Sequence, residues 1–499
     1  MSVSFNHIPS GIRVPLFYSE VDNSAAFTPS DNYQTLFLGQ MIAAGTAEAG
    51  KPVTVSSASM AVKLFGRGSM LARMVAAYRN VDTFGQLVCI PLKDATSAKA
   101  ATGTVTISGK ALESGVINLY VGGTRLQAAV AEDDEAAAIA SALADAVAVA
   151  KDLPVTAVAA EGVVTFTAKN AGTLGNDIRL ALNLRGAING ETTPSGVGVE
   201  VVAMAGGTID PTIDATVVKA MGDERYDFVA TPYSDTAVLD VLATEMGDDS
   251  GRWSYTRQIY GHVYAAKRGD VNALKTFGKA RDDQHCTIVG VEPEIASPVE
   301  EVLAAYTART SVFISADPAR PTQTGALTGI LAAPTEAQFT MNERQTLLEN
   351  GIATLTTVSG TVQIERAITT YQKNAMGDAD ASYLDSETLH TLAYILRRLK
   401  SVITSKYARH KLANDGTRYG AGQAIVTPAV IKGELIAQYR QMETAGIVEN
   451  TDLFKKYLVV ERNADNPNRL DVLFPPDLVN QLRIFAVLAQ FRLQYGSED

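Results

Sequence analysis

Cysteine is almost absent from this sequence. Of 499 residues, only Cys89 and Cys286 are cysteines, and they lie far apart in the chain. Two thiols so placed cannot supply the main constraint on a chain of this length, which excludes a disulfide-stabilised fold. A reducing compartment is the simpler interpretation of this cysteine usage.

Long apolar runs are also missing. A membrane-spanning helix needs about 18 or more consecutive apolar residues, and the best candidate, at 484–490, is bracketed by Arg483 and Arg492. The N-terminus carries Pro9 and Pro15 where a secretory signal would have its apolar core. We therefore expect neither a membrane span nor export by a signal peptide.

Positive charge is in the minority. The chain has 43 Lys and Arg against 54 Asp and Glu, which gives a formal net charge of −11. An acidic chain lacks the attraction to phosphates on which general nucleic-acid binding depends, so we expect no nucleic-acid partner. The hydrophobic content of 46% excludes disorder as the dominant state. At about 100–200 residues per domain, the length predicts roughly two to four domains.

Motifs that would signal catalysis or cofactor binding are absent as well. The chain contains no Gly-x-Ser-x-Gly elbow, no Walker loop and no Gly-x-Gly-x-x-Gly fingerprint. Its histidines do not stand at metal-ligand spacing; they are His7, His262, His285, His390 and His410. Acidic residues recur over 377–385, but the glycine and closing glutamate of an EF-hand are not at their offsets, so turn and capping carboxylates are favoured over calcium. We expect no catalytic residue, no metal and no cofactor.

The opening residues, 1–30, are predicted to form an extended arm. Short apolar pieces alternate here with proline and glycine, which favours an extended backbone over a helix. The apolar positions of this N-terminal arm are Ile8, Ile12, Val14 and Leu16.

An α/β pattern occupies residues 31–96 and resumes over 204–330. The expected strands are 33–38, 87–92, 228–231, 262–266 and 286–291, and the expected helices are 69–78, 235–246, 271–280 and 298–308. Strands that alternate with helices of this length favour a largely parallel sheet. The two stretches therefore predict one discontinuous middle domain.

The composition changes between these two stretches, over residues 97–203. The expected strands are 103–108, 116–121, 163–168 and 178–184, with an alanine-rich helix at about 134–151. Two strands, a helix and two further strands make a self-contained α+β unit, which we expect to end in the glycine-rich stretch 196–207. This unit is predicted to be a domain inserted into the middle domain.

Residues 331–480 are predicted to form a C-terminal core domain. Thr340 and Glu343 fit a capping box, and Gly351 stands just past the end of that helix. Pro428 opens a further helix that Gly446 closes. Strands are expected at 457–461 and 470–474.

A long helix is predicted from about Ser386 to Leu412. Its apolar stripe at helical spacing is Leu389, Leu392, Leu396, Leu399, Ile403 and Tyr407. Its remaining faces carry the basic residues Arg397, Arg398, Lys400, Lys406, Arg409 and Lys411, with no acidic residue between Thr388 and Leu412. In an acidic protein this is a local positive surface, either simply solvated or a docking surface for an acidic partner.

The end of the chain, 481–499, is predicted to be a second arm formed by one long strand. The fifteen residues from Gln481 to Tyr495 are rich in β-forming side chains, and at ~3.3 Å each they would reach about 50 Å. The apolar positions of this C-terminal arm are Leu482, Ile484, Phe485, Val487, Phe491 and Leu493. Such a strand requires a partner sheet, supplied either by its own domain or by a neighbouring molecule.

Several motifs together resemble a known family. They are Phe339-Thr-Met-Asn-Glu-Arg-Gln-Thr-Leu-Leu-Glu-Asn-Gly-Ile352, Ser382-Tyr-Leu-Asp-Ser-Glu-Thr-Leu389, Lys411-Leu-Ala-Asn-Asp-Gly-Thr-Arg418, Val459-Val-Glu-Arg-Asn463 and Asn468-Arg-Leu-Asp-Val-Leu-Phe-Pro-Pro-Asp-Leu-Val-Asn480. With the opening Ile8-Pro-Ser-Gly-Ile-Arg-Val-Pro-Leu-Phe-Tyr18, they resemble the tail sheath subunits of Mu-like contractile-tailed phages. The resemblance covers about 330–495 and the first 25 residues, and it reaches the inserted domain by architecture only.

This resemblance implies a structural protein of α/β and α+β multidomain class, with an α/β sheath core, an inserted α+β domain and N- and C-terminal strand-exchange arms. Sheath subunits of this family stack as six-membered rings around an inner tail tube, and the sleeve contracts to drive the tube through the bacterial envelope. The implied partners are further copies of the chain, the tube protein, and the baseplate and tail-terminator proteins, in the virion tail after assembly in the host cytoplasm. The basic residues 397–411 then become candidates for contact with the tube or with a neighbouring subunit.

Three alternatives remain at this stage. A bacteriocin-like or secretion-type contractile sheath would have the same architecture. An α/β enzyme with a scattered site is conceivable because ligands bind at the carboxyl ends of parallel strands, although no residue constellation supports one. A tail tube or adhesin protein fits poorly, because tube proteins are expected to be much shorter.

Overall fold

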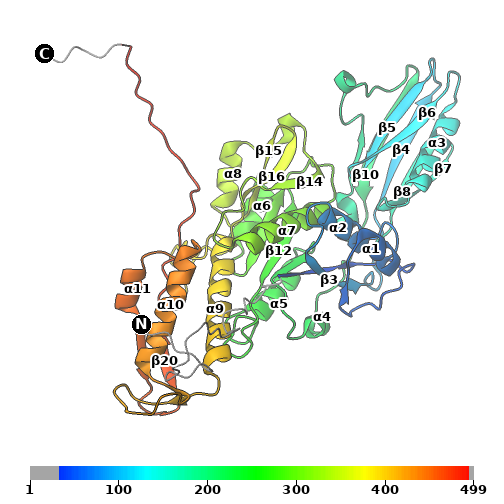
Figure 1. The fold of residues 1–499 in the computed structure, drawn as a ribbon. Coiled ribbons are helices and arrows are strands. Elements are labelled where there is room, and N and C mark those ends of the chain that lie inside the picture. The colour runs from blue at the N-terminus through cyan, green and yellow to red at the C-terminus, as the bar shows by residue number, and fades with distance from the viewer. Residues whose placement is uncertain (1–32, 494–499) are drawn as a thin grey trace, which may run out of the picture.

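The computed structural model of the chain describes residues 33–493. The N-terminal arm, with Ile8, Ile12, Val14 and Leu16, lies outside the described residues. Buried apolar side chains gather in three separate cores, one formed by 33–92 together with 213–367, one by 101–204 and one by 395–458. The unit that contains the second core and the unit that contains the third lie at opposite ends of the molecule (Figure 1).

The first core surrounds a six-stranded sheet with the order β13-β12-β11-β1-β3-β2. Its strands are β1 (Gln34–Gln40), β2 (Val53–Thr54), β3 (Gln86–Leu92), β11 (Phe228–Thr231), β12 (His262–Arg268) and β13 (Cys286–Val291). All neighbouring pairs are parallel except β2 with β3. β11 and β13 are buried along their whole length, as expected for strands covered on both faces. The predicted parallel sheet is confirmed.

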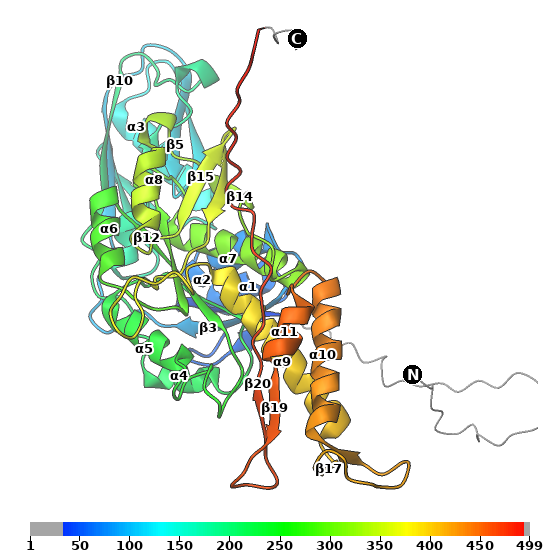
Figure 2. The same ribbon diagram turned by 90° about the vertical axis from the view of Figure 1, so that its left-hand side faces the viewer.

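Helices flank this sheet on both faces (Figure 2). They are α1 (Ala58–Phe65), α2 (Met70–Arg79), α4 (Ala215–Met221), α5 (Thr236–Met246), α6 (Val271–Lys279) and α7 (Val299–Ala316). α1 and α4 were not expected from the sequence. Their caps explain them, because the Ser57 and Asp214 side chains accept hydrogen bonds from backbone N–H groups of the first turns.

The inserted unit consists of two sheets and a helix. Its elements are β4 (Thr102–Gly109), β5 (Gly115–Val121), β6 (Thr124–Val130), α3 (Ala136–Val149), β7 (Val155–Ala160), β8 (Val163–Ala168), η1 (Thr173–Asp177), β9 (Leu180–Leu182), η2 (Ala187–Asn189) and β10 (Val197–Ala205). The sheets have the orders β10-β4-β8-β7 and β6-β5-β9. Most of the glycine-rich stretch 196–207 forms a strand that the sequence analysis did not predict: β10 pairs with β4, and Val197, Val199 and Val201 pack toward the core.

A three-stranded sheet follows the long helix α7. It has the order β14-β16-β15, from β14 (Ala326–Leu331), β15 (Thr354–Val358) and β16 (Thr361–Arg366), and it is accompanied by η3 (Thr335–Ala337) and α8 (Met341–Leu348). The predicted capping box is confirmed, since the Thr340 and Glu343 side chains each accept a hydrogen bond from the other's backbone N–H. Gly351 adopts a φ of +73°, which explains the glycine after the helix end.

The third core lies among the elements at the end of the chain. They are α9 (Ser386–Tyr407), β17 (Lys411–Leu412), β18 (Ile425–Val426), α10 (Pro428–Thr444), α11 (Thr451–Tyr457), β19 (Val459–Arg462) and β20 (Leu470–Leu473). Tyr439 of α10 stacks on Phe454 of α11 with ring centroids 3.7 Å apart, and Phe474 packs edge-on against Phe454. α9 ends at Tyr407 rather than at the predicted Leu412, because the chain enters the short strand β17.

Helix α9 connects the first core with the third. His390, in its N-terminal half, is buried beside the ring of Phe228 at the start of β11, and its Nε2 lies 2.8 Å from the hydroxyl oxygen of Tyr264. Leu399 and Ile403, in its C-terminal half, pack against the third core. Leu389 of the predicted apolar stripe is also buried in the N-terminal half, whereas Leu396, between the two ends, is exposed.

Over residues 33–493, none of the helices combines the length and the hydropathy that a bilayer crossing requires.

The buried histidines predict a loss of stability in mild acid. Burial lowers the pKa of His390 to about 3 and that of His262 well below its ordinary value. The unfolded chain binds these protons near pH 6.5 and the folded chain does not, so stability falls as the pH drops from about 6.5 toward 3, by up to about 1.4 kcal/mol per pH unit for each histidine.

Calorimetric melting between pH 4 and pH 7 would measure this dependence. His390→Gln is expected to make the melting temperature less sensitive to pH than in the parent chain. His410→Gln is the control, since His410 is exposed. Equal pH dependence in all three chains would contradict the assignment to buried histidine.

Candidate functional site

The carboxyl edge of the parallel sheet is the first place to look for a ligand site, because parallel sheets bind ligands where the strand order reverses. Here the reversal lies between β1 and β11. Gln40, at the end of β1, accepts a hydrogen bond from the Tyr233 hydroxyl at 3.1 Å. Its amide nitrogen donates to Asp94 and to the carbonyl of Ala171, both at 2.6 Å. Side chains of the protein itself therefore occupy this crevice.

The inserted unit closes the same edge. The Asn170 side chain accepts a hydrogen bond from the backbone N–H of Met70 at 2.9 Å, which caps the start of α2, and donates to the carbonyl of Met41 at 3.0 Å. A helix N-terminus that could have bound an anion is thus already satisfied. The protein's own groups thus occupy the place where a sheet of this topology binds ligands.

A buried ionic cluster lies beside this edge. Arg73 of α2 contacts Glu300 at 2.7 Å and Glu301 at 2.6 Å, both from the first turn of α7. Burial raises the pKa of Glu301 to about 7, although the Arg73 charge opposes the shift. The cluster joins α2 to α7, and Arg73 holds both carboxylates.

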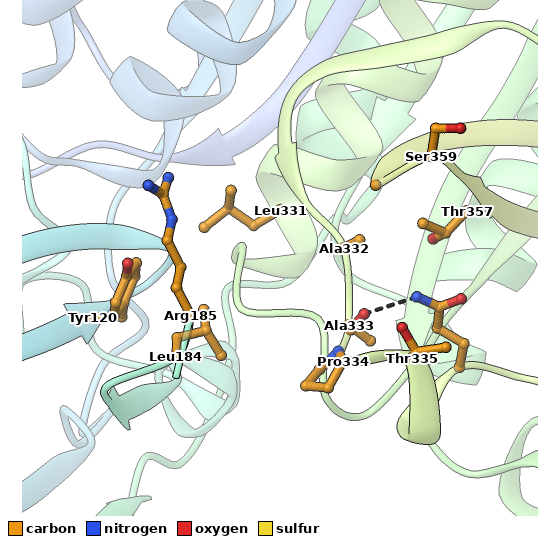
Figure 3. A pocket seen from close by; sticks show the side chains of 12 residues that line it. Tyr120, Leu184, Arg185, Leu331, Ala332, Ala333, Pro334, Thr335, Thr357 and Ser359 are labelled. Atoms are coloured by element: carbon orange, nitrogen blue, oxygen red, sulfur yellow. Dashed lines mark hydrogen bonds between the residues drawn. The ribbon is translucent and has the colours of Figure 1, made fainter. Parts of the chain in front are cut away.

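A pocket of about 510 Å³ lies between the inserted unit and the segment that follows β14. Figure 3 shows Tyr120, Leu184 and Arg185 on one side and Ala333 to Thr335 on the other, with a hydrogen bond to the Ala333 carbonyl. Arg185 is the only charged side chain of its lining, so the pocket has no acid–base pair. Among residues 33–493, no three His, Cys, Asp or Glu side chains are grouped so that they could hold a metal ion.

The predicted basic surface on α9 is only partly a surface. Arg397 is 12% exposed and contacts the fully buried carboxylate of Asp227 at 2.6 Å. Its guanidinium also lies over the rings of Tyr33 and Tyr260. Its assignment to an exposed basic face is therefore wrong: the acidic partner comes from the loop before β11, far away in the sequence.

Two more of the six basic residues are engaged by α10. Arg398 donates to the side-chain oxygens of Gln438 and Gln441 at 3.2 and 2.6 Å. Lys406 pairs with Glu434 at 3.0 Å. Both side chains thus have partners on the neighbouring helix, although Lys406 is itself exposed.

Three of the exposed basic residues form no ion pair with another described residue. They are Lys400, Arg409 and Lys411, and the β17–β18 loop adds the exposed Arg418, which the sequence analysis did not select. We call these four residues the basic patch. It lies on the unit that contains the third core, at the opposite end of the molecule from the inserted unit (Figure 1).

The C-terminal arm forms no strand within the described part of the chain, which ends at residue 493. It extends away from the folded body (Figure 1). The six predicted arm residues are 69–97% exposed: Leu482, Ile484, Phe485, Val487, Phe491 and Leu493. Its own domain thus does not supply the partner sheet that the sequence analysis left open. A contiguous exposed apolar segment of this kind marks a site of interaction with another chain.

The base of this arm, by contrast, is fixed. Leu478 forms a β-bridge with Val448, and the backbone N–H of Glu449 donates to the carbonyl of Asp477 at 2.9 Å. Further along, Gln481 donates to the carbonyl of Ala319 at 3.0 Å. In the sequence, Arg483 marks only the edge of an apolar run. In the structure, its side chain also contacts Asp385 and Glu387 of the folded body.

The β19–β20 hairpin is a two-stranded sheet with no further strand paired to it among residues 33–493. It packs against α10, while Val459, Val472 and Leu473 are exposed. Two strands alone leave both edges with unpaired backbone N–H and C=O groups, which are templates for additional strands.

These features define a class: a structural protein, whose sheet crevice is filled by its own side chains and whose main exposed apolar segment is a terminal arm. Two family models match the chain, the phage tail sheath protein central domain over 211–370 and the phage tail sheath C-terminal domain over 378–492. Over 496 residues, covering 99% of this chain and 100% of the relative, it is 39% identical to the Mu-like prophage FluMu tail sheath protein of Haemophilus influenzae. The chain belongs to the phage tail sheath protein family.

Solved structures of sheath tail proteins are also similar to this chain. One from Desulfitobacterium hafniense is 14% identical, with a TM-score of 0.49 over 95% of this chain and 97% of the other. One from Listeria innocua is 13% identical, with a TM-score of 0.48 over 90% and 92%. By its family, the protein is a structural component of the phage tail and not an enzyme.

Substitution of a buried basic residue on α9 and of an exposed one should affect stability differently. Arg397→Ala leaves the buried Asp227 carboxylate without this partner, and breaking a buried pair costs about 3–5 kcal/mol. Lys400→Ala removes an exposed charge and is expected to change stability by less than about 0.5 kcal/mol. Chemical denaturation of both variants measures the difference, and equal stabilities would show that the Arg397 contact contributes nothing.

Proposed function

We propose that the chain polymerises as stacked six-membered rings around an inner tail tube, and that the resulting sleeve contracts to drive the tube through the bacterial envelope. The observation that carries this proposal is the C-terminal arm, an exposed apolar segment attached to a fixed base. An isolated subunit gains nothing from exposing such a segment, whereas a neighbouring subunit with an open sheet edge would bury it.

The β19–β20 hairpin is the acceptor that we assign to this arm. Both of its edges are open, and it already packs on the third core through α10. A strand added to either edge would form main-chain hydrogen bonds while its alternate side chains cover exposed apolar residues such as Leu473. The arm predicted for residues 1–30 would serve a second neighbour in the same way.

Contraction then requires subunits that move relative to one another while the strand pairing between them persists. Polar contacts connect the three cores, such as Gln40 with the carbonyl of Ala171 and Arg397 with Asp227, so the subunit can move as one rigid unit. The backbone hydrogen bonds between paired strands keep their register when side-chain contacts between the subunits change. Heterologous contacts of one chain type build a helix without a second component.

We further propose the division into an N-terminal arm (1–30), a middle domain (31–96 and 204–330), an inserted domain (97–203), a C-terminal core domain (331–480) and a C-terminal arm (481–499). The inserted domain would face outward, where an added module does not obstruct stacking. The basic patch, at the far end of the molecule, would face the tube or a neighbouring subunit. Baseplate and terminator proteins would complete the assembly at its two ends.

The arm is tested by shortening the chain. A variant that ends after Arg483 keeps the fixed base and lacks the exposed apolar residues from Ile484 onward. The full-length chain is expected to form rings or hollow cylinders in negative-stain electron microscopy, in the presence of tube if a template is needed, whereas the shortened chain stays monomeric. Leu473→Asp tests the acceptor and should impair assembly in the same way. Cylinders built by the shortened chain would contradict the arm mechanism.

The basic patch is tested by reversing its charge. Each exposed ion pair contributes about 0.2–1 kcal/mol, so Lys400→Glu combined with Lys411→Glu should weaken the contact several-fold and reduce its dependence on salt. Lys93→Glu, an exposed position on the middle domain, is the control. Co-sedimentation with tube measures tube binding, and sheath length without tube measures the contact between subunits. If neither changes, the patch is an ordinary solvated surface.

A further inference from the structure

Arg483 stands where the C-terminal arm leaves the folded body. Its Nη2 lies 3.1 Å from Oε1 of Glu387 and 3.3 Å from Oδ1 of Asp385. Its Nη1 lies 3.4 Å from the side-chain oxygen of Gln323. The side chain is 11% exposed, in a segment whose other large side chains are almost fully exposed.

The groups that receive Arg483 are held in place by other contacts. Glu387, in the first turn of α9, is fully buried, and its Oε1 also accepts hydrogen bonds from the backbone N–H and the hydroxyl of Thr322, both at 2.8 Å. Asp385 receives Arg366 in a two-pronged contact at 2.9 and 3.0 Å. The receiving site is thus preformed at the start of the helix that joins two cores.

The contacts between the arm and the body change within one residue of Arg483. On its N-terminal side, Gln481 donates to the Ala319 carbonyl, and Gln323 donates to the Leu482 carbonyl at 3.5 Å. On its C-terminal side, Ile484 and Phe485 are exposed, and no backbone hydrogen bond ties the following described residues to the body. The described backbone hydrogen bonds between this segment and the body therefore end beside Arg483.

We propose that Arg483 is a positioning residue that clamps the root of the exchanged arm, so that the free arm always begins at Ile484. This inference rests on the proposed function, because it assigns the hinge of the arm exchange. Without Arg483 the buried Glu387 carboxylate would lose its cationic partner, and that cost favours the closed clamp. Only a guanidinium has the planar donor fork that reaches two carboxylates and an amide oxygen at once.

A fixed root matters because strand exchange depends on register. A slip of one residue turns every side chain of a strand to the opposite face. If the root could move, the apolar residues of the arm would meet the neighbouring sheet in alternative registers, and the spacing between subunits would vary. The clamp removes that freedom before assembly begins.

Trypsin tests the clamp in the full-length chain before assembly. It cleaves after both Arg483 and Arg492, and the clamp should protect the first bond. Since cleavage follows the population of the open state, we expect the bond after Arg483 to be cut at least about tenfold more slowly than the bond after Arg492. Arg483→Lys keeps the charge and the cleavage site and loses the fork, so this difference should largely disappear.

Two controls separate the clamp from general loss of folding. Arg492→Lys makes the same exchange outside the clamp and should leave cleavage at residue 483 slow. Asp385→Asn keeps Arg483 and the Glu387 contact and should raise cleavage at residue 483 by a smaller factor, with the main thermal transition retained. Equal cleavage at both sites in the parent chain would overturn the proposal, and so would unchanged protection in Arg483→Lys.

Assembly distinguishes this inference from the proposed function. If the parent chain forms cylinders, Arg483→Lys is expected to form them with irregular axial repeat, measured by electron microscopy and image averaging. A regular repeat in that variant would overturn the role in register even if trypsin shows a clamp. If the parent chain forms no assembly with tube present, the proposed function fails, and the proteolysis still decides whether Arg483 fixes the root.

Discussion

The structure depends on one buried ionic contact, between Arg397 and Asp227. The Asp227 carboxylate is fully buried and also receives Arg225 and the backbone N–H of Gln34. It therefore holds the start of β1 and the start of β11 to the middle of α9. Because the C-terminal half of α9 belongs to the third core, this contact couples the parallel sheet to the unit that carries the hairpin and the arm. A buried charge that several elements satisfy together permits little relative movement between them.

Polar groups that several elements satisfy together also explain why a sheet of enzyme-like topology is here a structural element. Its strand order creates a crevice, and polar groups from β1, from the segment after β11 and from the inserted unit meet there. Every hydrogen bond made among them is one that a ligand cannot make. The hydrogen bonds in the crevice fix the inserted unit to the body. Rigidity across this joint is what a subunit needs if it transmits force through its ends.

Features encoded locally were predictable from the sequence, and features encoded at long range were not. β13 is a short run of buried apolar residues, and the caps at Thr340 and Pro428 are local signals, so these elements were found. β6, β7 and β10 were missed because small or polar side chains weaken their alternation. The partners of Arg397 and Arg483 come from distant segments, and nothing near either arginine indicates that it is buried. Arg483 offered only one hint, a lone charge beside an otherwise apolar run.

The C-terminal arm is apolar surface that the folded subunit leaves unburied. Burying a large apolar side chain contributes about 1.5–3 kcal/mol, which opposes the cost of ordering the arm. In the proposed arm exchange, that free energy would be released when another subunit supplies a sheet edge, because the folded body does not bury the arm itself. The hairpin has the opposite property, since its edges are open and its strands are already ordered. If the arm and the hairpin are the two halves of one interaction, as we propose, their separate places on a rigid body would lead the chain to bind copies of itself in a line rather than to close on itself.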